Sequence, residues 1–395
     1  MSFKRNLHLL FFLFALKTYA QVTITNDTIP VVFHVINSNE TYGTGTNLDS
    51  LQLYSQIKVL NQDFNGVGFN VQNVPPVWQN LVAITGIKFV PALFDPSGNL
   101  LQEPGIHRVP YNTIPSLSAP GSGYSQTIIN SIIKPATGWP PSLYCNIWVL
   151  KLGGGINAYS TFPNSSGLSW LPTNPGVAFT DSLKDGIVCN YQFIGDTLNV
   201  TAPYNRGRSV THEMGHWLGL IHFYQGCGVQ YLPDLPPGDY SLCYGCPSWP
   251  CVQGICQGYP DGPMFNNFMM YTDDACMNMF TGLQGDTMKY VLHHAQFKNN
   301  LHNSWVYHTL PTSIEKLGKE EFKIFPNPSI NNFQIFLNNK EFNVLKVVNT
   351  VGEPVKFEYL KNGSSIRINS ESGVYFIFIE SEGKIFSKML FYYKQ

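Results

Sequence analysis

Apolar and polar positions follow two different periods in the first two thirds of the chain. Short runs of consecutive apolar residues, rich in β-branched side chains, predict buried strands at 30–36, 87–93, 145–150 and 186–191. Segments in which apolar residues recur every three or four positions predict helices at 51–64, 125–133, 208–218 and 283–294. This part of the chain is therefore expected to combine helices and strands in one α+β region.

The pattern changes after residue 308. Residues 309–321 mix Pro, Thr, Ser and Gly with charged residues and predict a linker. Beyond it, polar turns such as 361–363 and 382–383 separate short strand-like runs at 322–325, 332–337, 344–349, 364–369, 374–380 and 384–391. We expect residues 21–308 and 322–395 to form two domains, the second a small antiparallel β-sandwich.

The first twenty residues read as a secretory signal peptide. A short basic start with Lys4 and Arg5 is followed by an apolar stretch from Leu7 to Leu16, and Ala20 closes a small-residue exit. The stretch is too short to cross a bilayer, and no later run reaches the ~18 apolar residues that a membrane helix needs. We therefore predict export and no transmembrane segment.

Composition narrows the function classes. The chain has 395 residues, enough for two or three domains, with only 12% charged residues and a formal net charge of −1. No basic excess is available to bind nucleic acid, so we expect no nucleic-acid partner. All eight cysteines lie at or after Cys145, and an even count in an exported chain favours disulfides. A structural zinc site on the Cys243-x-x-Cys246 spacing is the competing interpretation.

Residues 212–222 carry the strongest chemical signal, H-E-M-G-H-W-L-G-L-I-H. On a helix, His212 and His216 lie one turn apart on the same face, so both rings can reach one metal ion. Gly219 can adopt a left-handed conformation that ends the helix and returns His222 to the same ion. Three imidazoles with a fourth position left for water predict a catalytic Zn²⁺ site.

Glu213 directly follows the first histidine. From there its carboxylate can accept a proton from a water molecule at the open zinc position. A bare H-E-x-x-H can arise by chance on a solvated helix, but the added Gly219 and His222 make coincidence a poor explanation. The motif therefore predicts metal-assisted hydrolysis.

The chain resembles the metzincin metalloproteases and, more closely, the pappalysin (cytophagalysin) family of secreted zinc endopeptidases. Beyond the zinc motif, the resemblance covers roughly residues 29–300. It rests on the first strand at 29–36, on the segment 105–108, on the glycines at 153–155, and above all on D-D-A-C-M-N-M-F-T at 273–281. It implies a two-lobed catalytic domain with the zinc cleft between the lobes, and protein or peptide substrates.

The family resemblance also assigns roles to residues near the zinc. Met269 is the methionine of a turn beneath the metal, although a single Met is equally at home in a core. Tyr271 can hydrogen-bond the oxyanion of the reaction, unless it is only a packed turn residue. Asp273 or Asp274 can select a basic residue at P1′, and either can instead cap a turn. The rim strand at 156–162 can pair with an extended peptide, while the glycines before it can be a plain flexible turn.

The resemblance implies disulfide pairs as well. Cys227–Cys256 and Cys246–Cys276 look like the pairs of the family, with Cys145–Cys189 and Cys243–Cys251 as additional pairs in this chain. Two departures stand out: Met270 occupies a place where the family commonly has Asp, and residues 238–241 lack its Asp-Thr-Pro loop. That loop helps to form a calcium site in some relatives, so the resemblance allows Ca²⁺ without requiring it.

The C-terminal region resembles a second family. F-P-N-P-S at 325–329 and G-V-Y-F at 373–376 are similar to the sorting domain of the type IX secretion system of Bacteroidetes. The resemblance implies export through that machinery to the outside or the outer-membrane surface of a Gram-negative bacterium. An ordinary carbohydrate-binding or adhesive sandwich is the alternative, but no aromatic-rich binding face is evident.

Taken together, these features predict a secreted zinc-dependent endopeptidase. A surface adhesin or binding protein built on an inactive protease scaffold is the alternative from another class. The complete histidine set and the presence of Glu213 favour the enzyme.

Overall fold

The computed structural model describes residues 27–163, 182–222, 227, 231–239, 242–307, 322–327, 329–337, 342–349, 354–360, 365–381 and 384–394. The predicted signal peptide (1–20) and the predicted linker (309–321) lie outside these ranges, as do the predicted turns at 361–363 and 382–383. Within the described residues, no helix is both long and apolar enough to cross a membrane.

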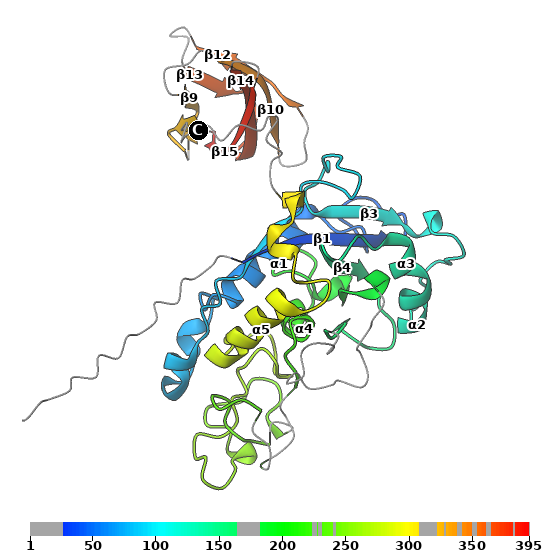
Figure 1. Ribbon diagram of the computed structural model, residues 1–395, viewed down its shortest axis with the longest axis vertical. Coiled ribbons are helices and arrows are strands. Elements are labelled where there is room, and N and C mark those ends of the chain that lie inside the picture. Colours follow the sequence, from blue (N-terminus) through cyan, green and yellow to red (C-terminus); the bar gives the residue numbers. More distant parts are fainter. Residues whose placement is uncertain are drawn as a thin grey trace, which may run out of the picture.

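A six-stranded sheet forms the framework of the first region (Figure 1). Strand β1 (Thr28–Asn37) pairs in parallel with β2 (Lys88–Pro91) and β3 (Ile106–Pro110) along one edge and with β4 (Cys145–Leu150) along the other. Strand β4 pairs in parallel with β6 (Ile187–Asn190), and β5 (Ala158–Ser160) closes the sheet antiparallel to β6. The sheet is thus parallel apart from its last strand.

Both faces of this sheet are buried, as expected for parallel strands with apolar runs. Val31, Phe33 and Val35 of β1 face a core shared with α1 (Ser50–Asp63) and α4 (Arg208–Trp217). The opposite face, with Ile36 of β1 and Trp148 of β4, packs against Ile129 and Ile133. Those two residues lie in a continuous helical segment made of α2 (Gln126–Ile128), a π-helical stretch (Ile129–Ile133) and α3 (Lys134–Thr137).

Helix α5 (Gly282–His294) follows the loops before residue 282 and packs against the core through Met288 and Leu292. Its start is fixed by a capping box in which Thr281 and Gln284 satisfy each other's backbone N–H groups. Short 3₁₀ turns connect the larger elements at Val71–Asn73, Pro76–Leu81, Tyr111–Thr113, Ser182–Lys184, Tyr191–Phe193, Val252–Gly254, Leu301–Asn303 and Trp305–Tyr307.

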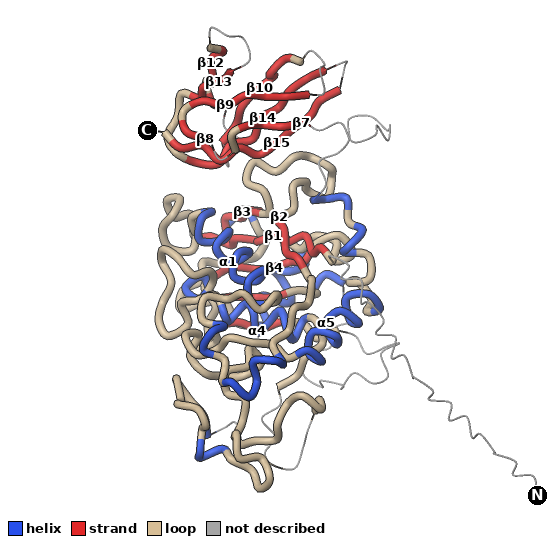
Figure 2. Tube along the Cα trace, turned by 90° about the vertical axis from the view of Figure 1, so that its left-hand side faces the viewer, coloured by secondary structure: helices blue, strands red, loops and turns tan. Residues whose placement is uncertain are grey.

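The described residues between 231 and 281 contain almost no regular structure, and the loops stand out in Figure 2. Three disulfides join them, namely Cys227–Cys256, Cys243–Cys251 and Cys246–Cys276. Cys243 and Cys246 are therefore both in disulfides, with Cys251 and Cys276, so they cannot bind a structural zinc ion.

The expected disulfide between Cys145 and Cys189 is wrong, because both thiols are free and buried. The reason lies in the strand register. Cys189 of β6 lies opposite Val149, which is four residues beyond Cys145 on β4. At about 3.3 Å per residue this offset is roughly 13 Å, well beyond the ~7 Å between Cα atoms that a disulfide tolerates.

The C-terminal residues form two sheets around a common core of Val347, Ile366, Ile377 and Leu390. One sheet has the order β11-β10-β14-β15-β8 and the other β12-β13-β9-β7. All strand pairs are antiparallel except β8 with β15. The strands are β7 (Phe322–Phe325), β8 (Ser329–Ile330), β9 (Asn332–Leu337), β10 (Asn343–Asn349), β11 (Pro354–Val355), β12 (Phe357–Tyr359), β13 (Ser365–Ile368), β14 (Gly373–Ser381) and β15 (Lys384–Tyr393).

One predicted helix is longer in the structure than expected, and one strand of the first sheet was not predicted. The helix predicted at 125–133 continues to Thr137, and Pro135 lies inside it, directly after the π-helical stretch Ile129–Ile133 that interrupts the α-helical hydrogen-bond pattern. The segment 106–110 is a strand that the apolar pattern did not predict. Its residues His107 and Arg108 are polar, so it lacks the continuous apolar run of its neighbours.

Candidate metal centre

Helix α4 and the turn after it bring three imidazoles to one point. The helix starts after Gly207, whose φ of 75° is left-handed, and ends at Trp217. Gly219 then adopts φ 91°, and the Leu220 N–H donates across it to the Gly215 carbonyl at 2.9 Å. This left-handed turn reverses the chain and lets His222 approach His212 and His216.

The Nε2 atoms of the three histidines face one another at 2.9 Å (His212–His222), 2.9 Å (His216–His222) and 3.1 Å (His212–His216). Ligand nitrogens around one tetrahedral ion at 2.0–2.1 Å would lie about 3.3 Å apart, so the spacing matches a metal site to within a few tenths of an ångström. Among the described residues, this is the only such convergence of His, Cys, Asp or Glu ligand atoms.

The other ring nitrogens decide what the Nε2 atoms can do. His212 Nδ1 lies 2.7 Å from the Phe268 carbonyl, and His216 Nδ1 lies 2.7 Å from the Leu220 carbonyl. A carbonyl only accepts, so both Nδ1 atoms carry the proton and both Nε2 atoms present lone pairs. Two lone pairs 3.1 Å apart repel each other unless a cation lies between them. The donor set and its tautomers therefore fit a zinc ion.

Burial keeps the three rings neutral, which is the form that binds metals. It lowers the pKa of His212 well below its ordinary value, the pKa of His216 to about 4 and that of His222 to about 3. Neighbouring imidazoles lower the pKa of His212 and His222 further.

Glu213 lies beside the histidines and is held by a residue that the sequence motif does not contain. The Ser160 hydroxyl donates to Glu213 Oε2 at 2.8 Å. Burial raises the pKa of Glu213 to about 7, and the hydrogen bond from Ser160 offsets part of that rise. A carboxyl group with a pKa near neutrality is suited to accept and return a proton.

Met269 packs against Gly215 of α4, next to the position that the resemblance gives to the turn methionine. It is fully buried, and its sulfur lies where a Cβ on Gly215 would have to stand. The side chain of Asn267 fixes the turn by accepting from the Met269 N–H at 3.0 Å. This contact explains why glycine precedes the second histidine, since any larger residue would displace the methionine.

Tyr271 projects beside the third histidine. The residue is 56% exposed, and its ring lies 4.8 Å from the His222 ring, between centroids. Its hydroxyl is 3.4 Å from His222 Nδ1. The phenol is therefore exposed next to the three histidines rather than enclosed in the turn.

The two aspartates after this turn have different surroundings. Asp274 is 1% exposed, and its Oδ2 accepts from the backbone N–H groups of Arg206 (2.8 Å) and Arg208 (3.1 Å). It is buried at the start of α4 and accepts two backbone N–H groups there, which favours the alternative that Asp274 is a cap. Asp273 is partly exposed and remains the candidate for substrate binding.

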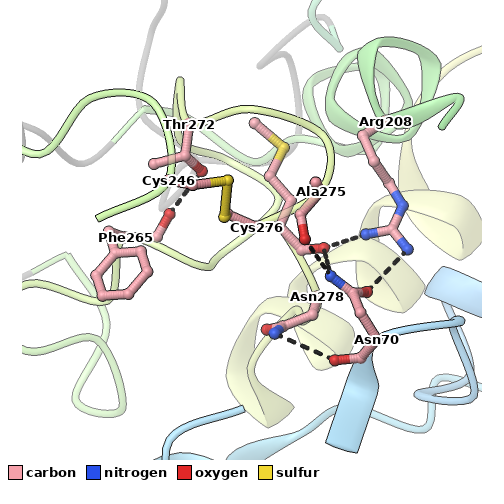
Figure 3. The surroundings of a disulfide bond; sticks show 9 residues. Asn70, Arg208, Cys246, Phe265, Thr272, Ala275, Cys276 and Asn278 are labelled. Carbon is pink, nitrogen blue, oxygen red and sulfur yellow. Dashed lines mark hydrogen bonds between the residues drawn. A yellow bond between two sulfur atoms is a disulfide. The ribbon is translucent and has the colours of Figure 1, made fainter. Parts of the chain in front are cut away.

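A buried arginine, Arg208, connects the first turn of α4 to the segment around Cys276 (Figure 3). Arg208 Nε lies 2.9 Å from Asp63 Oδ2 at the end of α1, and its guanidinium donates to the Met277 carbonyl and to Asn70 Oδ1. Asn70 in turn donates to the carbonyls of Ala275 (2.8 Å) and Met277 (3.1 Å). The segment next to Cys276 is thus tied to the first turn of α4.

Sequence reasoning did not assign a role to Ser160 or to the ion pair of Arg208 and Asp63. Ser160 lies in the predicted rim strand, but only the pairing of β5 with β6 and its contact with α4 show which way its side chain points. Arg208 and Asp63 are far apart in the chain, and no spacing rule connects them. Tyr240 and Ser241, in the loop where calcium was allowed, lie outside the described residues.

Two family models match the chain. Residues 128–293 match the family described as pregnancy-associated plasma protein-A, and residues 323–391 match the secretion system C-terminal sorting domain. The first match contains the three histidines, and the second contains the strands from 323 to 391.

Curated relatives and solved structures agree with the first match. Extracellular metalloprotease 1 of Coccidioides posadasii is 29% identical over 270 residues, which cover 66% of this chain and 75% of that protein. An extracellular metalloprotease of Verticillium alfalfae is 29% identical over 265 residues, with the same coverage. Mature mirolysin of Tannerella forsythia, solved in complex with a cleaved peptide, is 31% identical with a TM-score of 0.57. The match covers 70% of this chain and 96% of that chain.

Proposed function

This chain belongs to the pappalysin family of metalloendopeptidases, and we propose that it hydrolyses peptide bonds with zinc held by His212, His216 and His222. The relatives are extracellular metalloproteases, and the chain is a secreted metalloendopeptidase. The observation that carries the zinc proposal is the convergence of three Nε2 atoms, of which at least two present lone pairs to each other.

A zinc ion bound there would polarise the scissile carbonyl and lower the pKa of a water molecule at its fourth position. The side chains of the protein supply the remaining steps. Glu213 takes the proton from the attacking water and later gives it to the leaving amine, so that one carboxyl group acts first as base and then as acid. The exposed hydroxyl of Tyr271 is placed to donate to the oxyanion that forms during attack.

Replacement of Glu213 by Gln tests the mechanism. The variant keeps the size of the side chain and the zinc ligands but removes the base, so we expect one zinc per chain and a fall in kcat of at least about 10²–10⁴-fold. A matched Glu371→Gln variant, at an exposed position of the C-terminal sandwich, should cleave casein like the parent. Chelator treatment should abolish cleavage, and added Zn²⁺ should restore it.

Casein cleavage by Glu213→Gln at the parental rate would end this mechanism. If the purified parent chain binds zinc but cleaves nothing, the inactive-scaffold alternative replaces the enzyme.

The proposal extends to specificity through Asp273. Its partly exposed carboxylate follows the Met269 turn and is the acidic group that can face a basic P1′ side chain. A peptide library should show preferred cleavage before Arg or Lys. Asp273→Asn should reduce that preference about fivefold, since a partly screened ion pair contributes about 1 kcal/mol. Asp286→Asn on the exposed side of α5 should leave it unchanged. A library profile without basic preference in the parent would remove this part of the proposal.

The C-terminal match concerns delivery rather than catalysis. The sorting domain implies that secretion machinery recognises residues 323–391. We propose that this machinery is the type IX system and that the catalytic region reaches the outside or the outer-membrane surface of a Gram-negative cell. Deletion of residues 322–395 should leave the enzyme inside the producing cell, while secretion of the truncated chain at parental levels would contradict this assignment.

A further inference from the structure

The side chain of Ser160 lies at the point where the last strand of the sheet meets the zinc helix. Ser160 is 5% exposed, and its hydroxyl is 2.8 Å from Glu213 Oε2. A carboxylate oxygen without a proton can only accept, so Ser160 donates to it. One of the two carboxylate oxygens of Glu213, Oε2, is therefore hydrogen-bonded to Ser160.

Strand β5 holds Ser160 firmly in this position. Its backbone pairs antiparallel with β6, with Ser160 opposite Ile187. The preceding residue, Tyr159, points to the other face of the sheet, where its hydroxyl lies 3.4 Å from Asn130 Oδ1 and its ring lies 5.3 Å from Lys134 Nζ. Because side chains alternate along a strand, anchoring Tyr159 on one face aims Ser160 at α4 on the other.

From this geometry we infer that Ser160 is a positioning residue for the general base, an inference that rests on the proposed peptidase function. Its hydroxyl fixes the rotation of the Glu213 carboxyl group and occupies Oε2. Oε1 is then the oxygen that takes the proton from water and passes it to the leaving amine.

Proton accounting supports this division of roles. When Oε1 binds the proton, Oε2 becomes the carbonyl oxygen of a neutral acid and can still accept from Ser160. The Ser160 hydrogen bond therefore persists in both protonation states, and the carboxyl group need not rotate between the two proton transfers. Without the hydroxyl, the carboxyl group is free to rotate, and fewer encounters present the basic oxygen to water.

Three variants test the inference in the full-length zinc enzyme. Ser160→Ala removes the donor and should lower kcat about tenfold, a part of the roughly 10²–10⁴-fold that a general base contributes. KM and zinc content should stay at the parental values, because neither peptide contacts nor zinc ligands change. Ser160→Thr keeps a hydroxyl on a strand residue and should restore kcat to within about threefold of the parent.

Ser304→Ala is the matched control. Ser304 is similarly buried, and its hydroxyl donates to the Leu143 carbonyl at 2.9 Å. Its loss should lower the melting temperature as much as Ser160→Ala does while leaving kcat unchanged. In a crystal structure of Ser160→Ala, the carboxyl group of Glu213 should occupy a different or split orientation.

The outcomes separate two kinds of failure. Parental kcat in Ser160→Ala, combined with an inactive Glu213→Gln, overturns the role of Ser160 and leaves the peptidase mechanism in place. Parental kcat in both Ser160→Ala and Glu213→Gln overturns the mechanism itself. A fall in kcat that Ser304→Ala reproduces would show that Ser160 only supports the fold.

Discussion

Helix α4 with the sheet behind it and the loops between Cys227 and Cys276 are held in place by different interactions. The first region buries apolar side chains on both faces of the sheet and encloses two ion pairs, Arg208–Asp63 and Lys298–Asp185. The loops contribute few residues to that core and are joined by three disulfides. Each region thus uses the stabilisation that its sequence makes available: packing where strands and helices form, and covalent links where they do not.

The two regions meet at residues 272–278. Thr272 donates to the Phe265 carbonyl within the loops, and the Met277 carbonyl accepts from Arg208 (Figure 3). Between them, Asp274 accepts from the backbone N–H groups at the start of α4. The position of α4 therefore depends on both the packed core and the disulfide-linked loops, because this short segment is bonded to both.

The largest effect is expected from breaking the charge network of the packed region. Arg208→Met leaves Asp63 buried without its partner, which costs about 3–5 kcal/mol of unfolding free energy. Arg206→Met, two positions earlier and exposed, should change stability by less than about 0.5 kcal/mol. Urea unfolding measures both values. A loss below about 1 kcal/mol in Arg208→Met would show that the ion pair adds nothing to this region.

A smaller and more local effect is expected in the loops. Replacing Cys246 and Cys276 by Ser opens a link across 30 positions and should cost about 2–4 kcal/mol. The link of Cys243 and Cys251 spans only eight positions, so its loss should cost less.

Hydrogen exchange then distinguishes the two regions. Without Cys246–Cys276, amides between 231 and 276 should exchange faster while those of β1 and β4 stay protected. Equally faster exchange in the sheet would show that the sheet and the loops are not stabilised separately.

Lys134 gives the packed region a pH-dependent contribution to its stability. The side chain is fully buried, donates to the Lys184 carbonyl at 2.9 Å, and lies 4.8 Å from the ring of Trp148. Burial lowers its pKa to about 7, although nearby Asp185 opposes the shift.

Between pH 7 and its ordinary pKa, the folded state binds fewer protons at Lys134 than the unfolded state does. The lysine's contribution to stability therefore rises with pH in this window, by at most about 1.4 kcal/mol per pH unit, and falls to its lowest value as the pH drops through 7. Lys134→Met should remove this rise in urea unfolding at about pH 7, 8 and 9, and Lys88→Met at an exposed position should keep it. A parental slope in Lys134→Met would refute the assignment.

The smallest effect is expected at the two free cysteines, which behave as packed apolar side chains. Replacing Cys145 and Cys189 by Val should change stability by less than about 1.5 kcal/mol each. A thiol reagent should find no reactive group in the native parent chain and two after unfolding without reductant. Rapid reaction in the native state would show that these residues do not belong to the closed core.

Sequence reasoning predicted the parts of the molecule in which function or periodicity constrains neighbouring positions. Helix α4 and its turn are one example, because the spacing of His212, Gly219 and His222 is enough to predict that the histidines converge. Strand β4, predicted at 145–150 and observed with the same bounds, is another, since it is an apolar run buried on both faces.

Long-range arrangements were not predictable in the same way. The fate of Cys189 depends on the register of β6 against β4, which no local pattern reveals. Asp274 could equally have faced a substrate, and only the folded chain shows its carboxylate at the start of α4. The hydroxyl of Ser160 became relevant because β5 closes the sheet beside Glu213.

The interleaving of the disulfides has a consequence for an enzyme that meets other copies of itself. The link from Cys227 to Cys256 overlaps the one from Cys246 to Cys276, so every peptide bond from 227 to 276 is bridged by at least one of them. A single nick by a neighbouring molecule in these loops would leave both fragments covalently attached. The segment from 227 to 276, which follows the three histidines, can therefore be cut once without coming apart.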